Sequence, residues 1–157
     1  MKLFYRDIKK EDLPIWEKLA KSEFLEDDFC DEKYLLEIWE KLKGWILLSD
    51  NGEWIGCCFI DSNFHKYNSN GIHFLESCIF PKFRGQGYAK YLAKIRFDAS
   101  IGYRKSICIN PDNKASIAVA TKYGFKELEP HKSWIVYICE KDYYPQELKK
   151  LELEYIK

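Results

Sequence analysis

Residues 79–89 read Ile-Phe-Pro-Lys-Phe-Arg-Gly-Gln-Gly-Tyr-Ala, and most of what this sequence predicts about the fold follows from them. The segment that leads into it, Ile72 to Phe80, is mostly apolar and typical of a β-strand. Beyond it, apolar residues recur at the spacing of one helix face, at Tyr88, Leu92, Ile95 and Ala99, whereas three cations lie off that face, Lys90, Lys94 and Arg96. The sequence therefore predicts a strand, a short glycine-rich turn and a helix in succession.

The turn between this strand and this helix has the features of an anion site. Gly85 and Gly87 leave main-chain N–H groups able to face outward, at the positive end of the helix dipole. Because glycine has no Cβ, a ligand can approach the backbone closely. The turn predicts a bound phosphate or pyrophosphate; the alternative is an ordinary strand–helix connection that contains two glycines.

Two familiar phosphate loops are excluded by spacing. A dinucleotide fingerprint needs a third small residue after Gly85-Gln86-Gly87, and Lys90 stands at that position. A Walker A loop ends in Gly-Lys-Ser/Thr, which is absent. What remains is the pattern Arg-x-x-Gly-x-Ala, formed by Arg84, Gly87 and Ala89.

A second segment, residues 113–125, predicts a helix with recognisable ends. Asp112 or Asn113 can cap its N-terminus, and Gly124 can adopt the left-handed conformation at its C-terminus. Phe125 then begins a strand.

Together, the two segments resemble the GNAT superfamily of N-acetyltransferases. The acyl-CoA loop of that family reads Gln/Arg-x-x-Gly-x-Gly/Ala, and Pro81 is placed as in many members. Its second motif is an asparagine, a helix and a terminal Gly-Phe, as in residues 113–125. The Asn-x-x-Ser pattern of Asn113 and Ser116 is most similar to the branch that acetylates the N-termini of ribosomal proteins. The resemblance covers roughly residues 3–140, and its specific part is 76–125.

Composition fits a single globular domain over residues 1–157. Hydrophobic residues make up 46% of the chain and charged residues 32%, a balance usual for soluble proteins. The 25 basic and 25 acidic residues cancel, which argues against a general nucleic-acid binder. No apolar run approaches the roughly 20 residues of a membrane span, and residues 1–7 lack a signal-peptide pattern, so we expect a cytoplasmic protein without membrane partners.

The six cysteines show no Cys-x-x-Cys spacing, so no metal or redox site is predicted. Several lie within apolar strand patterns, where a reduced cysteine packs as a small hydrophobic residue.

Hydrophobic periodicity predicts a three-layer α/β domain with a mixed sheet. The expected strands are 3–6, 45–49, 54–60, 72–80, 106–109 and 133–140, with a further strand from Phe125; the expected helices are 13–24, 31–42, 88–99, 113–123 and a charged C-terminal helix at 145–157. Residues 62–70 read as a polar surface loop. The resemblance implies the GNAT fold, with a mostly antiparallel sheet in which strand four splays from strand five and acyl-CoA lies between them. In the family, strand four often carries a bulge near the acetyl group, which a sequence does not reveal.

The resemblance implies direct attack of an amine on the thioester of acetyl-CoA in a ternary complex. Only the free amine attacks, and its ammonium form has a pKa of about 10, so a base or a desolvating pocket must help to remove a proton. The tetrahedral intermediate needs a donor for its oxyanion. The resemblance assigns this role to the main-chain N–H of Ile79 or of its neighbour, Cys78.

The same resemblance assigns the binding of acetyl-CoA. The N–H groups that would hold its pyrophosphate belong to Gly85, Gln86, Gly87, Tyr88, Ala89 and Lys90. The side chains of Arg84 and Lys90 could add charge or remain solvated. Asn113 would bond the pantetheine arm or a neighbouring backbone group, in addition to capping its helix, and Ser116 would face the cofactor one turn later.

Glu76 is the candidate general base, directly or through a water molecule. It lies on strand four, three residues before Ile79, where the family often has a carboxylate. The alternative interpretation is a strand-edge glutamate paired with a lysine. His73 is the other candidate, since an imidazole has a pKa suited to neutral pH, although a single histidine on a strand is often structural.

The expected proton donor to the thiolate is missing. Many members of the family have a tyrosine on the last helix, and Ala120 stands at that position. Tyr123, about one turn along the same face, could substitute, or water could protonate the thiolate. Packing beneath the helix cap is the alternative role of Tyr123.

The acceptor is expected to be a primary amine of a small molecule or a protein. In the family, the segment between the first two helices lines the acceptor site; here it contains Glu26-Asp27-Asp28-Phe29, which could steer a cationic amine or be a solvated loop. Other candidate contributors are the loop 61–70, Trp134, Tyr143 and Tyr144. The sequence does not choose among a protein N-terminus, a lysine, a polyamine, an aminoglycoside and a small metabolite.

Two other classes of function stay open. The absence of a tyrosine at residue 120 is compatible with a catalytically silent acyl-CoA-binding module. The aromatic content of 17% and the charged tail are compatible with an interaction protein, although buried aromatic residues explain the same content. Homodimers are common in the family, so a homodimer is also expected.

Overall fold

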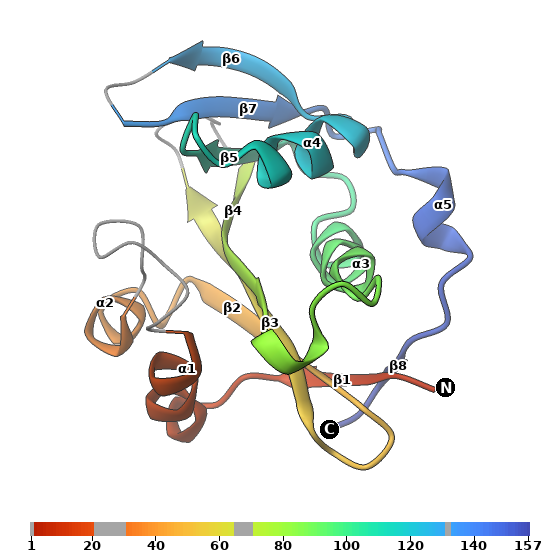
Figure 1. Cartoon of the computed structure of the whole chain (residues 1–157). Helices are drawn as coiled ribbons and strands as arrows, with labels where there is room; N and C mark the ends of the chain where they lie inside the picture. Colours follow the sequence, from red (N-terminus) through yellow and green to blue (C-terminus); the bar gives the residue numbers. More distant parts are fainter. Residues whose placement is uncertain (1, 21–30, 65–70, 131–132) are drawn as a thin grey trace.

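The computed structural model describes residues 2–20, 31–64, 71–130 and 133–157. Its centre is an eight-stranded mixed sheet in the order β6-β7-β5-β4-β3-β2-β1-β8 (Figure 1). The strands are β1 (Phe4–Asp7), β2 (Leu42–Leu48), β3 (Trp54–Phe64), β4 (Gly71–Ile79), β5 (Lys105–Ile109), β6 (Lys126–Pro130), β7 (Ile135–Cys139) and β8 (Glu154–Tyr155). The pairs β4–β5 and β1–β8 are parallel, and the other pairs are antiparallel.

Helices cover both faces of this sheet, which confirms the predicted three layers (Figure 1). They are α1 (Leu13–Ala20), α2 (Glu32–Glu37), α3 (Ala89–Ala99), α4 (Lys114–Lys122) and α5 (Gln146–Lys149). The core beneath α1 and α2 includes Leu13, Trp16, Leu35, Ile46, Cys57, Phe59, Cys78 and Phe80. The core beneath α3 includes Ile60, Ile72, Phe74, Leu92, Ile95, Phe97, Phe125 and Tyr137.

The splay between β4 and β5 is confirmed. Their parallel pairing joins three positions, Ile72–Lys105, His73–Ser106 and Phe74–Ile107. Beyond them, β4 continues to Ile79 and β5 to Ile109 without further pairing to each other. The two strands therefore diverge toward their carboxyl ends, where the glycine-rich turn and the start of α4 lie.

The second helix is shorter than predicted. Asp31 does cap it, because its carboxylate accepts a hydrogen bond from the N–H of Tyr34 at 2.8 Å. However, α2 ends at Glu37, and Leu42 already belongs to β2, where it is paired with Asp61 of β3. Pairing along the sheet thus replaces the last turn that the helical spacing indicated.

The prediction of a charged C-terminal helix is wrong beyond its first turn. After α5, the chain extends and forms β8 beside β1: Leu3 accepts from the N–H of Glu154 at 3.1 Å, and Tyr5 from that of Ile156 at 2.9 Å. The rings of Tyr5 and Tyr155 lie 5.3 Å apart. The edge of β1 supplies hydrogen bonds that a local charge pattern cannot predict.

The strand cysteines pack as predicted. Cys57, Cys58, Cys78 and Cys139 are free thiols buried in the two cores. The loop expected from residue 62 is wrong at its start, since β3 extends to Phe64. Residues 65–70 of that loop lie outside the described residues.

Candidate active site

The glycine-rich turn connects β4 to α3 in the conformation that its composition requires. A 3-10 turn over Pro81–Phe83 precedes it, and Gly85 and Gly87 have φ of 72° and 84°. A Cβ at either glycine would have no heavy atom within 4 Å, so these positions need glycine for their backbone conformation and not because of crowding. The turn is therefore an open surface of main-chain groups at the N-terminal end of an 11-residue helix.

Side chains of the turn brace its backbone. The Nε of Arg84 donates to the carbonyl of Ile79 at 2.9 Å, and the amide of Gln86 donates to the carbonyl of Lys82 at 3.2 Å. Arg84 thus ties the beginning of the turn to the end of β4. The ammonium of Lys90 lies 5.7 Å from the centre of the Tyr91 ring on the exposed start of α3.

A β-bulge interrupts β4 just before the residues that the resemblance assigns to the oxyanion. The register with β3 slips between the pairs Cys58–Ser77 and Ile60–Phe74. Leu75 and Glu76 are consequently opposite a single residue of β3.

The bulge reverses the faces that alternate residues of β4 occupy. Ile72 and Phe74 belong to the core beneath α3, whereas Cys78 and Phe80 belong to the core beneath α1 and α2. Counted back from Cys78, the alternation places Glu76 toward α1 and α2. Glu76 is half-buried.

His73 has a different environment from Glu76. It is only 7% exposed, and its Nδ1 lies 2.7 Å from the hydroxyl of Ser106 on β5. Burial, together with the charge of Arg96, lowers the pKa of His73 to about 4. The imidazole is therefore neutral at neutral pH. Its enclosure and its contact with Ser106, rather than its basicity, favour the half-buried Glu76 as the base.

Arg96 is the residue of this region that sequence reasoning missed. It lies off the predicted apolar face of α3, yet it is only 8% exposed. Its Nη1 donates to the carbonyl of Leu75 in the bulge at 3.0 Å, and its guanidinium lies 4.5 Å from the centre of the Phe74 ring. The available signal was its position between two apolar residues, Ile95 and Phe97, near the middle of the helix.

The second motif begins α4 beside the carboxyl end of β5. The Oδ1 of Asn113 accepts a hydrogen bond from the N–H of Ser116 at 3.1 Å, so Asn113 is the helix cap. Ser116 is half-buried. At the other end, Gly124 has φ of 92°, and the ring of Tyr143 packs against it.

Tyr123 lies within the core rather than at an open surface. It is 5% exposed, and its ring centre lies 6.5 Å from that of Phe97 in an edge-on arrangement. Burial is the main cause that raises the pKa of its hydroxyl. Ala120 is buried in the same core. These contacts support packing as the role of Tyr123.

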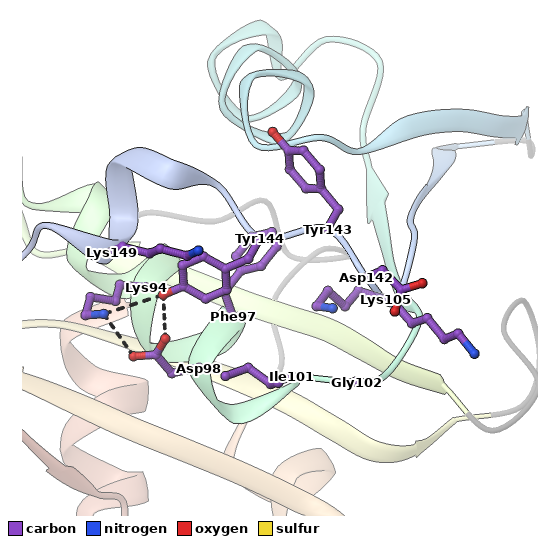
Figure 2. Close-up of a pocket in the computed structure, with 11 residues that line it drawn as sticks. Lys94, Phe97, Asp98, Ile101, Gly102, Lys105, Asp142, Tyr143, Tyr144 and Lys149 are labelled. Carbon is purple, nitrogen blue, oxygen red and sulfur yellow. Dashed lines mark hydrogen bonds and ion pairs between the residues drawn. The ribbon is translucent and has the colours of Figure 1, made fainter.

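Two of the aromatic residues considered for the acceptor site lie elsewhere. Tyr143 and Tyr144 line a cavity of about 550 Å³ beside the C-terminal half of α3, at the opposite end of that helix from the glycine-rich turn (Figure 2). Two of its four lysines make polar contacts: Lys94 lies 3.2 Å from Asp98 and 3.4 Å from the hydroxyl of Tyr144, and Lys105 donates to the carbonyl of Tyr103 at 2.7 Å. This cavity is therefore separate from the candidate active site.

The remaining acceptor candidates are only partly described. Residues 26–29 lie outside the described part of the chain. Asp61 is 3% exposed, and its carboxylate lies 3.6 Å from Lys41. Trp134 is half-buried at the start of β7.

Comparison with known proteins agrees with this geometry. The model of the Acetyltransferase (GNAT) family matches residues 7–125, which include both motifs. The chain belongs to this family. No curated protein sequence matches it.

Solved structures of similar fold include N-acetyltransferases. A chimera of the spermidine N-acetyltransferase from Vibrio cholerae is 14% identical, with a TM-score of 0.70 over 96% of this chain and 100% of that one. The V. cholerae enzyme in complex with CoA and spermine is 16% identical, with a TM-score of 0.65 over 87% and 93% of the two chains. The PaiA N-acetyltransferase from Thermoplasma acidophilum in complex with coenzyme A is 15% identical, with a TM-score of 0.64 over 89% and 99%. At these identities the likeness establishes the GNAT fold alone.

Among the residues that the structure describes, no helix is long and apolar enough to cross a membrane. Within the same ranges, His, Cys, Asp and Glu side chains form no group of three or more suited to a metal ion.

Proposed function

We propose that this GNAT protein transfers an acetyl group from acetyl-CoA to a primary amine. The observation that carries the proposal is the divergence of β4 from β5, which leads directly to the open glycine-rich turn at the start of α3. Family membership supports the acyl-CoA-dependent chemistry. The divergence provides an unpaired strand edge for the pantetheine arm, and the turn provides main-chain donors for the pyrophosphate.

The donors to the pyrophosphate are proposed to be the N–H groups from Gly85 to Lys90. Arg84 supports this site by fixing the turn to the carbonyl of Ile79, and its charge adds to the attraction. The pantetheine arm is proposed to lie between Cys78 and Ile79 on β4 and Asn113 and Ser116 at the start of α4.

The proposed reaction is direct attack in a ternary complex. The amine nitrogen forms a bond to the thioester carbonyl carbon, the carbon–sulfur bond breaks, and coenzyme A leaves as a thiolate. A main-chain N–H of Cys78 or Ile79 stabilises the oxyanion. Glu76 accepts the amine proton, directly or through water. Water protonates the thiolate, with Tyr123 as the secondary candidate because its ring is packed on Phe97.

The amine is proposed to enter from the side of α1 and α2. Alternation counted back from Cys78 assigns Glu76 to that side of β4. A polyamine is the first acceptor class to test, because similar folds belong to spermidine N-acetyltransferases. A peptide N-terminus is the second, on account of the Asn-x-x-Ser pattern.

The proposal is tested by incubating the protein with acetyl-CoA and, separately, spermidine, a lysine-containing peptide blocked at its N-terminus and a peptide with a free N-terminus. Release of the CoA thiol together with a product heavier by one acetyl group is the expected result for at least one acceptor. Binding of acetyl-CoA without turnover across a broad amine panel would instead identify a silent acyl-CoA-binding module.

A further inference from the structure

The buried cation on α3 has an unusual set of contacts. Arg96 is almost fully enclosed, and burial lowers its pKa, while the carboxylate of Glu76 acts in the opposite direction. An arginine remains charged in proteins, so this position holds a positive charge inside the core. Among the described residues, its buried Nε has no hydrogen-bond partner. A buried charge with an unsatisfied donor lowers the stability of the fold unless its other contacts compensate.

Those remaining contacts converge on the β4 bulge. The Nη1 of Arg96 reaches the carbonyl of Leu75, one of the two residues that form the bulge, at 3.0 Å. The guanidinium lies over the ring of Phe74, which immediately precedes the bulge, at 4.5 Å. Leu75 joins the core beneath α1 and α2, whereas its carbonyl is held from the α3 side. Arg96 therefore holds the main chain at the bulge, the point where the side chains of β4 change from one face of the sheet to the other.

The position of the bulge sets the orientation of everything after it on β4. Because side chains alternate along a strand, a slip of one residue moves each of them to the opposite face. The bulge therefore fixes the orientation of Glu76 and of the main-chain groups of Cys78 and Ile79. The proposed function assigns proton transfer to Glu76 and oxyanion stabilisation to these main-chain groups.

We propose that Arg96 is a positioning residue for acyl transfer, which holds the β4 bulge in register and so fixes Glu76 and the oxyanion donors relative to the thioester. This role rests on the proposed N-acetyltransferase function. Arg96 acts through Leu75 and touches neither acetyl-CoA nor the amine. A hydrophobic residue would fill the same space without the cost of burying a charge, so packing alone does not account for an arginine at this position.

The kinetic test compares Arg96→Met with Arg96→Lys. Methionine fills the space without a donor, and lysine retains both a charge and a donor in a different geometry. We expect Arg96→Met to lower kcat by about a hundredfold, as for a misplacement of about 1 Å, with Kd for acetyl-CoA within about twofold of wild type. Arg96→Lys is expected to recover part of this loss.

Lys105→Met is the matched control. Lys105 is also a buried cation, lying 5.6 Å from the centre of the Phe97 ring and donating to a main-chain carbonyl, but its partner is Tyr103 and not the bulge. Its substitution is expected to leave kcat unchanged. An equal loss of kcat in Lys105→Met, or a kcat within twofold of wild type in Arg96→Met, would overturn the proposal.

A second measurement does not depend on turnover and separates this role from the proposed function. Amide ¹⁵N–¹H spectra of wild type, Arg96→Lys and Arg96→Met are compared, each without ligand. If the role is correct, the largest shift changes fall at residues 74–79, even if no amine is ever found to be acetylated. Should Arg96→Met fail to fold, Arg96→Lys supplies the same comparison. Unchanged amide shifts at residues 74–79 in the folded variants would show that Arg96 does not hold the bulge.

Discussion

Glu76 and His73 illustrate how environment separates two candidate bases on one strand. His73 is enclosed beside Ser106, whereas Glu76 lies in the bulge and is half-buried. We expect Glu76→Gln to lower kcat/KM by about a hundredfold or more, because the amide cannot accept the amine proton. Steady-state kinetics with the best acceptor provide the measurement. A kcat/KM within a few-fold of wild type would remove Glu76 from the mechanism.

His73 makes a separate prediction about stability. Its pKa falls from 6.5 in the unfolded chain to about 4 in the folded protein, so between these values the unfolded state binds more protons. The stability contributed by His73 is complete above about pH 6.5 and declines as the pH falls toward about 4.

Urea unfolding at pH 5.0 and 7.5 tests this dependence in wild type and His73→Gln. Other groups titrate in both proteins, so the informative quantity is the difference between their pH dependences. We expect wild type to lose more stability than the variant, by an amount on the order of 2 kcal/mol. Equal losses in the two proteins would show that His73 keeps an ordinary pKa.

Features that neighbouring residues determine could be predicted from the sequence. Gly124 has the left-handed conformation that its motif predicted, and Asn113 caps its helix as expected. Arg96 was not recognised because its burial depends on a carbonyl of another element. Neither helical spacing nor charge reveals that partner.

Among the secondary-structure elements, β8 shows what local patterns cannot predict. It pairs with β1 through main-chain hydrogen bonds and an aromatic contact at 5.3 Å between Tyr5 and Tyr155. We expect Tyr155→Ala to reduce the free energy of unfolding by about 0.5–1.5 kcal/mol. Tyr103→Ala, at a side chain of similar exposure, serves as the control in chemical denaturation. A loss no greater than that of the control would mean that β8 contributes little to stability.

For helix boundaries and for the bulge, as for β8, the sequence predicts what neighbouring residues determine and misses what depends on another element. The start and end of α4 were predictable, since Asn113 and Gly124 act on adjacent backbone groups. The early end of α2 was not predictable, because Leu42 belongs to β2 through its pairing with Asp61 on another strand. The bulge at Leu75 and Glu76 is likewise a property of two strands together.

The whole molecule exposes a sheet edge that bears on assembly. All five residues of β6 are exposed at one end of the sheet, and Leu128 within it is 48% exposed. Unpaired edges of this kind are sites for pairing with another chain. We expect sedimentation at micromolar concentration to show a homodimer. A monomer over the same range would contradict this expectation and weaken an interaction role for the protein.

The turn between β4 and α3 is proposed to bind the pyrophosphate of acetyl-CoA. Thermal unfolding with and without saturating acetyl-CoA measures this binding in wild type, Gly87→Glu and Gly52→Glu. Gly52, in the turn before β3, has the same φ of 84° as Gly87 and equally open surroundings, so both substitutions introduce the same backbone strain and the same charge.

Ligand at about 100 times Kd adds about 2.7 kcal/mol of stability, which corresponds to roughly 5–10 °C in Tm for a domain of this size. We predict this rise in wild type and in Gly52→Glu, and none in Gly87→Glu. No rise in folded wild type, or an equal rise in Gly87→Glu, would contradict the assignment of the acyl-CoA site.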